Sequence, residues 1–242
     1  MKCRFDKPYR IGPSDCDHTA RLSIPAAFDL FMDMAAEHAE DLGIGASFMM
    51  KNNKFWLTAK TRVKFLRRPF MMENVMLSTW PLMPRGVQEI RDYSISSADG
   101  KVIAFGKTQW AVLDTKTGSL VKIQDLFDEE WELETDAVLD EPFARVSEDV
   151  TDCEEIGTYK VRSNDIDLGG HMNNVAYVRA LMNAFGTAEL DAMKISDMEI
   201  CYKNSCFEGD ILTFYRRNTD GGIETVVKRA DGSTAVLAKM IS

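Results

Sequence analysis

The chain has 242 residues, with 29 Lys and Arg against 38 Asp and Glu, so its formal net charge is −9. A content of 45% hydrophobic and 28% charged residues is that of a globular protein and excludes a disordered chain. The acidity argues against nucleic-acid binding, because neutralising phosphates takes surplus basic side chains. No apolar run approaches the ~20 residues of a membrane span, and charges throughout the first ten residues argue against a signal peptide.

Five cysteines at irregular spacing, without a Cys-x-x-Cys pair, predict free thiols rather than disulfides or a structural metal site. With no signal peptide expected, they predict a cytoplasmic protein. There is no Gly-rich phosphate loop and no metal-ligand cluster of suitable spacing, so we expect neither a metal nor another cofactor.

The first half predicts a short strand, a polar loop, a helix and a run of strands. The strand is Tyr9–Ile11, and the helix begins at Ile24 behind Ser23, a good N-cap. Apolar residues at helical spacing continue the helix to Gly43, which ends it. Four strands separated by turn residues follow: Phe55–Leu66, Val75–Pro81, Val87–Ser96 and Val102–Leu113.

An acidic stretch follows these strands. Residues 125–155 carry fourteen Asp or Glu and one basic residue, Arg145. We interpret the stretch as a solvated linker between two domains. The alternative is an acidic site for a partner.

The second half repeats the first. Residues 159–185 align with 9–35 at a constant offset of 150, without gaps. Five positions are identical: Tyr9/Tyr159, Asp15/Asp165, Asp17/Asp167, Ala26/Ala176 and Met32/Met182. Asn173 takes the place of Ser23 as N-cap of a second helix that continues to Phe185. Strands again follow: Ile195–Tyr202, Asp210–Tyr215, Ile223–Lys228 and Ala235–Ile241. A helix followed by a meander of strands is typical of an α+β unit.

The loop before the second helix carries a recognisable motif. Its residues are Asp167, Gly169, His171, Asn173, Asn174 and Tyr177. They resemble the pattern Asp-x-Asn-x-His-x-Asn-Asn-aromatic of the plant and bacterial acyl-acyl-carrier-protein (acyl-ACP) thioesterases. The first half is similar to the same family at Asp17–Arg21, Ala35–His38, Trp80-Pro81 and Ala98–Gly100.

The resemblance implies a tandem double hotdog of class α+β, each unit an antiparallel sheet wrapped around a long central helix. It places an N-terminal hotdog at 1–126, the acidic linker at 127–155 and a C-terminal hotdog with the active site at 156–242. The implied reaction hydrolyses fatty acyl-ACP to free fatty acid and holo-ACP in fatty acid biosynthesis. It also implies that the N-terminal hotdog shapes the pocket for the fatty acyl chain.

The chemistry needs an oxygen nucleophile, for which Asp167 is the best candidate. A carboxylate can act as general base toward water or attack the thioester itself, and the sequence leaves both open. His171 can hydrogen-bond the water or protonate the leaving thiolate. The alternative is a purely structural loop, with the aspartate holding backbone amides and the histidine packed. The first copy has Arg21 in place of His171, so we expect that half not to catalyse.

Five more residues are candidates for oxyanion binding or positioning: Gly169, Gly170, Asn173, Ser205 and Cys206. Amides near a helix N-terminus suit an oxyanion, although the glycines equally fit a turn with positive φ. The chain departs from the family twice, with Gly169 in place of a usual asparagine and Ser205 in place of a usual glutamate. Substitute carboxylates are Glu199, Glu208 and Asp165. A Cys206–His171 nucleophile pair is the weaker alternative.

The segment 51–70 carries seven basic residues and no acidic one. Acyl carrier proteins are acidic, so five of these residues are candidates for carrier binding: Lys60, Arg62, Lys64, Arg67 and Arg68. An exposed strand face or edge is the equally weighted alternative.

Three other functions remain open: an acyl-CoA thioesterase, a non-catalytic acyl-binding protein and, less favoured, a hotdog dehydratase. No Gly-His-Phe-Pro motif surrounds His171, which argues against the last. The sequence leaves the oligomeric state open, with a homodimer among the alternatives.

Overall fold

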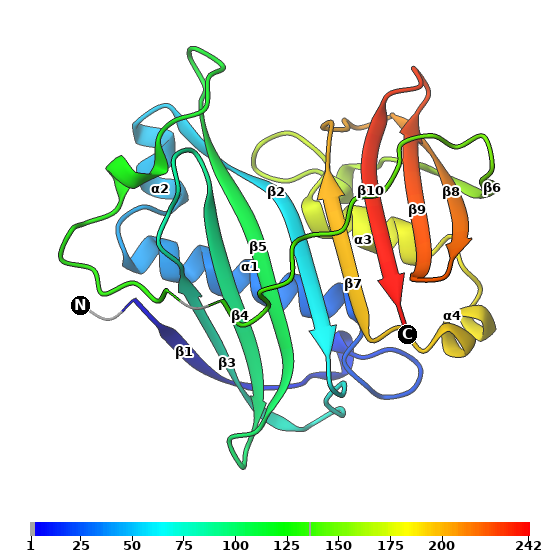
Figure 1. Ribbon diagram of the computed structural model, residues 1–242, viewed down its shortest axis with the longest axis horizontal. Coiled ribbons are helices and arrows are strands. Elements are labelled where there is room, and N and C mark those ends of the chain that lie inside the picture. The colour runs from blue at the N-terminus through cyan, green and yellow to red at the C-terminus, as the bar shows by residue number, and fades with distance from the viewer. Residues whose placement is uncertain (1–2, 136) are drawn as a thin grey trace. The chain divides into compact units, whose positions relative to one another are not determined.

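The computed structural model describes residues 3–135 and 137–242. The chain divides into two compact units, Met1–Glu141 and Pro142–Ser242. In each unit an antiparallel sheet carries its main helix on one face (Figure 1). The expected α+β class and the duplication are therefore confirmed.

The described residues of the first unit form five strands in the order β1-β3-β4-β5-β2, all neighbours being antiparallel. The strands are β1 Phe5–Arg10, β2 Lys54–Phe65, β3 Asn74–Pro81, β4 Glu89–Ser97 and β5 Val102–Asp114. The helices are α1 Ile24–Asp41, α2 Ala46–Lys51 and two 3-10 turns, Pro13–Asp15 and Ile123–Leu126. The predicted strands all exist to within a few residues, whereas α2 was not predicted.

The second unit repeats the arrangement with the strand order β7-β10-β9-β8-β6, again antiparallel. The strands are β6 Glu154–Lys160, β7 Asp197–Tyr202, β8 Ile211–Thr219, β9 Gly222–Arg229 and β10 Thr234–Ile241. The helices are α3 Asn174–Met182, α4 Thr187–Met193 and the 3-10 turn Ser163–Asp165.

Helix α1 begins where the sequence predicts. The Ser23 hydroxyl accepts a hydrogen bond from the Ala26 amide at 3.2 Å, which satisfies one of the free N–H groups of the first turn. The buried face of the helix packs on the sheet, where Phe31 stacks on Tyr93 of β4. Gly106 of β5 makes this close packing feasible, because a Cβ there would lie 2.4 Å from the Phe31 ring.

Helix α3 starts as expected but is shorter. Asn173 caps it by accepting from the Val175 amide at 2.8 Å. The prediction that the helix continues to Phe185 is wrong, because α3 ends at Met182 and tight turn bonds follow, including Phe185 N–H to Met182 O. Phe185 is still buried, so this apolar side chain packs in the core from the turn before α4 rather than from the helix.

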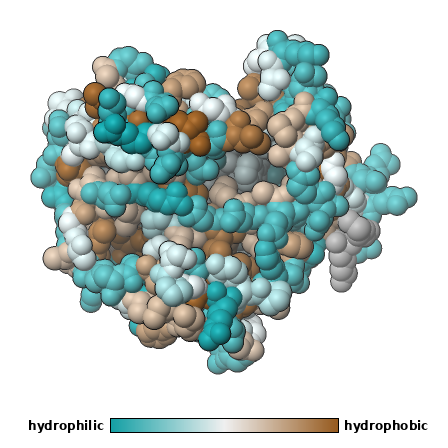
Figure 2. Space-filling view, turned by 180° about the vertical axis from the view of Figure 1, so that it is seen from behind, coloured by the Kyte–Doolittle hydropathy of each residue, from teal (hydrophilic) through white to brown (hydrophobic). Residues whose placement is uncertain are grey.

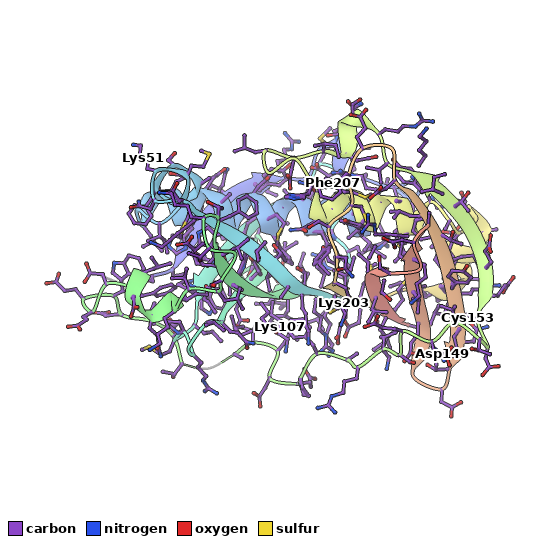
Figure 3. The ribbon with its side chains drawn as sticks, turned by 90° about the horizontal axis from the view of Figure 1, so that it is seen from above. Lys51, Lys107, Asp149, Cys153, Lys203 and Phe207 are labelled. Carbon is purple, nitrogen blue, oxygen red and sulfur yellow. The ribbon has the colours of Figure 1, made fainter. Side chains whose placement is uncertain are left out.

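The acidic stretch is not simply solvated. In the first unit the Val138 amide donates to Asp92 Oδ2 at 2.8 Å, and Lys107 Nζ donates to the Leu139 carbonyl at 2.9 Å. Leu139 is 5% exposed. Figure 1 shows the chain crossing the sheet face opposite to α1, and Figure 3 labels Lys107 beside it. The expectation of a solvated linker is therefore wrong for this part.

The stretch also contacts the second unit's own sheet. The Ala144 amide donates to Glu199 Oε2 of β7 at 2.6 Å, and Glu148 forms an ion pair with Lys203 at 3.0 Å. Glu199, a candidate substitute carboxylate, is thereby engaged on its own strand and 8% exposed.

Large apolar side chains remain on the surface of both units. Those exposed in the second unit are Leu168, Phe207 and Ile211. Figure 2 shows one face of the molecule, on which apolar residues form smaller groups among hydrophilic ones. No helix in the described ranges is long and apolar enough to cross a membrane.

Candidate active site

The motif residues Asp167 and His171 stand at the two ends of one tight turn before α3. The Asp167 amide donates to the His171 carbonyl at 2.9 Å, and the Gly170 amide donates to the Asp167 carbonyl at 3.0 Å. Gly170 has φ +76°, a conformation that glycine adopts without strain. The turn therefore holds both candidate side chains through backbone bonds.

The first unit contains the same turn, bond for bond. The Asp17 amide donates to the Arg21 carbonyl at 2.9 Å, and the Ala20 amide donates to the Asp17 carbonyl at 3.0 Å. Ala20 has φ +56°, which matches the sign at Gly170. The sequence repeat thus reflects one backbone frame used twice.

A tyrosine and an aspartate anchor each copy. In the second unit the Tyr159 hydroxyl and the Arg162 amide both donate to Asp165 Oδ2, at 2.8 and 2.7 Å. In the first unit Tyr9 donates to Asp15 in the same way, at 2.9 Å. Asp165 is therefore occupied as an anchor, which argues against it as the substitute catalytic carboxylate.

A second segment lies against each turn. The Met172 amide donates to the Cys206 carbonyl at 2.8 Å, as Leu22 does to the Pro69 carbonyl at 2.9 Å. Ser205 thus occupies the place that Arg68 holds in the first unit.

Because of this difference, the carboxylates of Asp17 and Asp167 have different partners. Arg68 forms an ion pair with Asp17, whose Oδ1 also accepts from Thr19. Burial raises the pKa of Asp17, but hydrogen bonds from Thr19 and Arg68 outweigh it and leave the pKa below its ordinary value. In the second unit Asp167 Oδ1 accepts from the Gly169 amide at 2.8 Å, while Oδ2 has no hydrogen-bond partner among the described residues.

The imidazole of His171 packs on an aromatic ring. Its centroid lies 5.1 Å from that of Phe207, at an interplanar angle of 55°. Figure 3 labels Phe207, which is 48% exposed. The first unit places the Arg21 guanidinium over the Phe70 ring at 4.0 Å. Within the described part of the chain, no hydrogen bond joins the Asp167 carboxylate to the His171 ring.

The glycine amides are already used inside the turn. Gly169 donates to the Asp167 carboxylate and Gly170 to the Asp167 carbonyl. This arrangement favours the turn interpretation over the oxyanion one. Asn173 likewise has its side-chain oxygen in the N-cap of α3.

Cys206 is a packed residue. It is fully buried, and burial raises the pKa of its thiol above the ordinary value. Its amide donates to the Tyr177 hydroxyl at 2.9 Å. A buried thiol with a raised pKa is a poor nucleophile, which argues against a Cys206–His171 pair. Ser205 beside it is exposed.

Sequence reasoning missed Phe207 and the bond between Tyr177 and Cys206. A second internal repeat was the signal for Phe207. Arg67–Glu73 and Asn204–Asp210 align without gaps, with Phe70 opposite Phe207. In both, the phenylalanine amide donates to the acid three residues on, at 2.9 Å to Glu73 and 3.0 Å to Asp210.

Comparison with known families decides the relationship. The model of the acyl-ACP thioesterase N-terminal domain matches residues 2–131, and that of the C-terminal domain matches residues 148–239. The chain belongs to the acyl-ACP thioesterase family. Among the described residues of this family member, no three His, Cys, Asp or Glu side chains gather as a metal site requires.

Several relatives are plant enzymes. A chloroplastic acyl-[acyl-carrier-protein] hydrolase of Cuphea viscosissima is 24% identical over 217 residues, covering 85% of this chain and 52% of its own length. A chloroplastic palmitoyl-acyl carrier protein thioesterase of Cuphea hookeriana is 25% identical over 219 residues, covering 85% and 51%. The chain thus spans about half the length of these curated relatives.

Solved structures of family members share the double hotdog fold. An acyl-ACP thioesterase from Bacteroides thetaiotaomicron superposes with a TM-score of 0.88 at 20% identity, covering 98% of this chain and 97% of its own. The 12:0-ACP thioesterase from Umbellularia californica gives 0.83 at 19% identity, covering 98% and 96%. The fold expected from the resemblance is confirmed.

The basic residues predicted for carrier binding are largely engaged within the first unit of this thioesterase-family chain. Arg62 is 6% exposed and lies 3.5 Å from Glu141, and Arg67 makes two hydrogen bonds to Glu73. Arg68 pairs with Asp17. Each of these three arginines therefore already has an acidic partner within its own unit, and their binding of a carrier stays a prediction.

The other two candidates lie on β2. Lys60 is half-buried, and the Lys64 side chain is 36% exposed, 4.0 Å from Glu141. The acidic stretch therefore covers part of the strand face that the sequence predicts to be open.

Proposed function

We propose that this protein is an acyl-ACP thioesterase that hydrolyses fatty acyl-ACP to free fatty acid and holo-ACP. Family membership supports the reaction class. The observation that carries the assignment of the site is the contrast between two identical frames. Arg68 pairs with the Asp17 carboxylate, whereas Asp167 Oδ2 has no hydrogen-bond partner among the described residues and Ser205 stands at the position equivalent to Arg68.

In the proposed mechanism the open oxygen of Asp167 takes a proton from water as the water attacks the thioester carbon. The C–O bond forms, the C–S bond breaks, and His171 protonates the leaving thiolate. Direct attack by Asp167, giving an anhydride that water then hydrolyses, uses the same open oxygen. Phe207 supports the imidazole by packing on its ring.

The domains in this proposal are hotdogs at 1–126 and 156–242, joined by 127–155, with the reaction in the cytoplasm. The acidic carrier binds at the predicted basic residues of the first unit, Lys60, Arg62, Lys64, Arg67 and Arg68, among which the Arg67 and Lys64 side chains are 40% and 36% exposed.

The test is thiol release from matched acyl-ACP and acyl-CoA substrates. We expect acyl-ACP to be preferred and Asp167→Asn to lower kcat by about 100-fold or more, the usual scale for losing a general base. Asp17→Asn is the matched control, since it makes the same change in the same frame of the first unit, and it should leave kcat within a few-fold. Cys206→Ser should also retain activity.

Other outcomes point to the alternatives. Equal or faster turnover of acyl-CoA would assign the protein as an acyl-CoA thioesterase. Turnover that survives Asp167→Asn would move the chemistry to another residue. Acyl binding without turnover would make it a non-catalytic binder, a candidate favoured by the missing hydrogen bond between Asp167 and His171.

A further inference from the structure

A row of polar side chains lies inside the first unit, on the sheet face that α1 covers. Glu89, Trp110 and Thr58 are direct partners across β4, β5 and β2, so they share one face. Arg91, two residues after Glu89 on the same strand, fixes which face this is. Its guanidinium lies 3.0 Å from Nδ1 of His38 on α1.

Four atoms of this region are buried without a hydrogen-bond partner among the described residues. They are Thr58 Oγ1, Glu89 Oε1, Tyr93 OH and Trp110 Nε1. Tyr93 and Glu89 are 0% and 2% exposed. Thr108 and Trp110 approach the Tyr93 hydroxyl closely enough to lower its pKa, but neither meets it with full hydrogen-bond geometry. We refer to Thr58, Glu89, Tyr93 and Trp110 as the interior polar row.

Such a concentration calls for an explanation. An unsatisfied buried polar group costs about 1–3 kcal/mol, and native proteins keep them to a few per 100 residues. Here four lie on three neighbouring strands. Thr58 and Trp110 are half-buried as whole residues, while the two polar atoms that they contribute to the row are themselves buried.

The chemistry of the row matches a hydroxyl group. Trp110 N–H can only donate, Glu89 Oε1 can accept, and the Thr58 and Tyr93 hydroxyls do both. A hydroxyl also donates and accepts, so it can satisfy several of these atoms at once.

The charges nearby favour an uncharged ligand. The positive charge of Arg91 is balanced locally, since its Nε lies 3.6 Å from Glu89 Oε1. His38 adds no charge at neutral pH, because burial, aided by Arg91, lowers its pKa to about 4. Burial raises the pKa of Glu89 to about 7, so this carboxyl can either accept from a ligand or donate to it.

We propose that the interior polar row binds the hydroxyl group of a hydroxylated acyl chain, and that hydroxyacyl thioesters are therefore preferred substrates. This inference rests on the proposed function, in which the first unit shapes the acyl pocket. The interior polar row would favour a hydroxylated chain over an unsubstituted one, because the unsubstituted chain leaves the polar atoms of the row without hydrogen bonds. A purely apolar pocket has no such preference.

Binding is tested with free acids of one chain length: unsubstituted, β-hydroxy, mid-chain hydroxy, ω-hydroxy and ω-carboxy. Affinity is measured by calorimetry, and the indole N–H signal of Trp110 is followed by NMR, assigned through Trp110→Phe. We expect one hydroxy acid to bind about tenfold or more tighter than the plain acid and to shift that signal. Tyr93→Phe should remove most of the preference while plain-acid binding stays within a few-fold. Tyr215→Phe, in the second unit, is the matched control.

Several outcomes overturn the inference. If all acids bind alike and the indole signal does not move, the row holds ordered water only. If the ω-carboxy acid binds best, the row is a charged site. If no acid binds, the first unit holds no acyl pocket.

Thioester turnover measured in parallel separates this inference from the proposed function. Hydrolysis without preference for hydroxyacyl chains contradicts the inference alone. Hydroxy acids that bind at Trp110 without turnover of any thioester contradict the proposed function, and with it the substrate preference, while the hydroxyl-binding row itself is supported.

Discussion

Asp92 gives the sharpest test of how the acidic stretch is held on the first unit. Its carboxylate is fully buried beneath residues 137–141, accepts from the Val138 amide and is paired across the sheet with Lys107. Burial is the main reason that its pKa rises to about 6 from the ordinary 3.8, against the lowering effects of the Val138 bond and Lys107. The folded state thus binds a proton more tightly than the unfolded state.

The sign and size of the effect follow. The contribution of Asp92 to stability should be most favourable below about pH 4, become less favourable as pH rises from about 4 to 6, and stay level above that. The difference between about 6 and 3.8, at about 1.4 kcal/mol for each pH unit, amounts to about 3 kcal/mol at neutral pH. Asp92→Asn removes this burial cost, and its amide oxygen can still accept from Val138. The variant should therefore be about 1–3 kcal/mol more stable than wild type at about pH 7.

The assay is urea unfolding of both proteins across this pH range. The gap should narrow as pH falls from about 6 and close well below 3.8, where Asp92 is protonated in both the folded and the unfolded state. Asp99→Asn is the control, since the pKa of Asp99 is lowered to about 2 by hydrogen bonds from Ser97 and Lys101. Asp99→Asn should lower the free energy of unfolding near neutral pH and have a smaller effect in acid. An Asp92→Asn variant less stable than wild type at every pH would refute the reasoning, and would show that the ionised carboxylate is bound favourably by Lys107.

Two further substitutions probe packing. Gly106→Ala should lower stability by about 1–3 kcal/mol in thermal unfolding, because the new methyl group meets the Phe31 ring; an unchanged melting temperature would contradict the close contact. Tyr177→Phe removes the acceptor of the buried Cys206 amide and should cost about 1–3 kcal/mol in urea unfolding; faster hydrogen exchange at that amide is the second expected sign.

Local features were predictable because local chemistry determines them. Ser23 and Asn173 cap their helices as predicted, since a side-chain oxygen before an apolar run satisfies the first turn in any context. The strands followed from alternation and turn residues, and the repeat located the candidate site.

Long-range burial was not predictable from the same signals. Arg62 lies on the strand face that alternation makes exposed, yet the chain returns some eighty residues later and places Glu141 against it. Nothing local to Arg62 indicates this covering. Leu139, a lone buried leucine in the acidic stretch, was the available hint.

The candidate site was predicted in its residues but not in its contacts. The motif identified Asp167 and His171, while the arrangement of Ser205 opposite Arg68 depends on a second aligned segment. Only the structure brings the two segments of each unit together.

The doubled turn separates the groups that hold the loop from the side chains proposed to react. Backbone amides, carbonyls and the Tyr–Asp anchor fix its shape, and they are the same in both units. The side chains that differ, Arg68 against Ser205 and Arg21 against His171, lie outside those bonds. The side chains at these positions can therefore be substituted without breaking the bonds that hold either turn. The first unit should accordingly accept the side chains of the second at the equivalent positions.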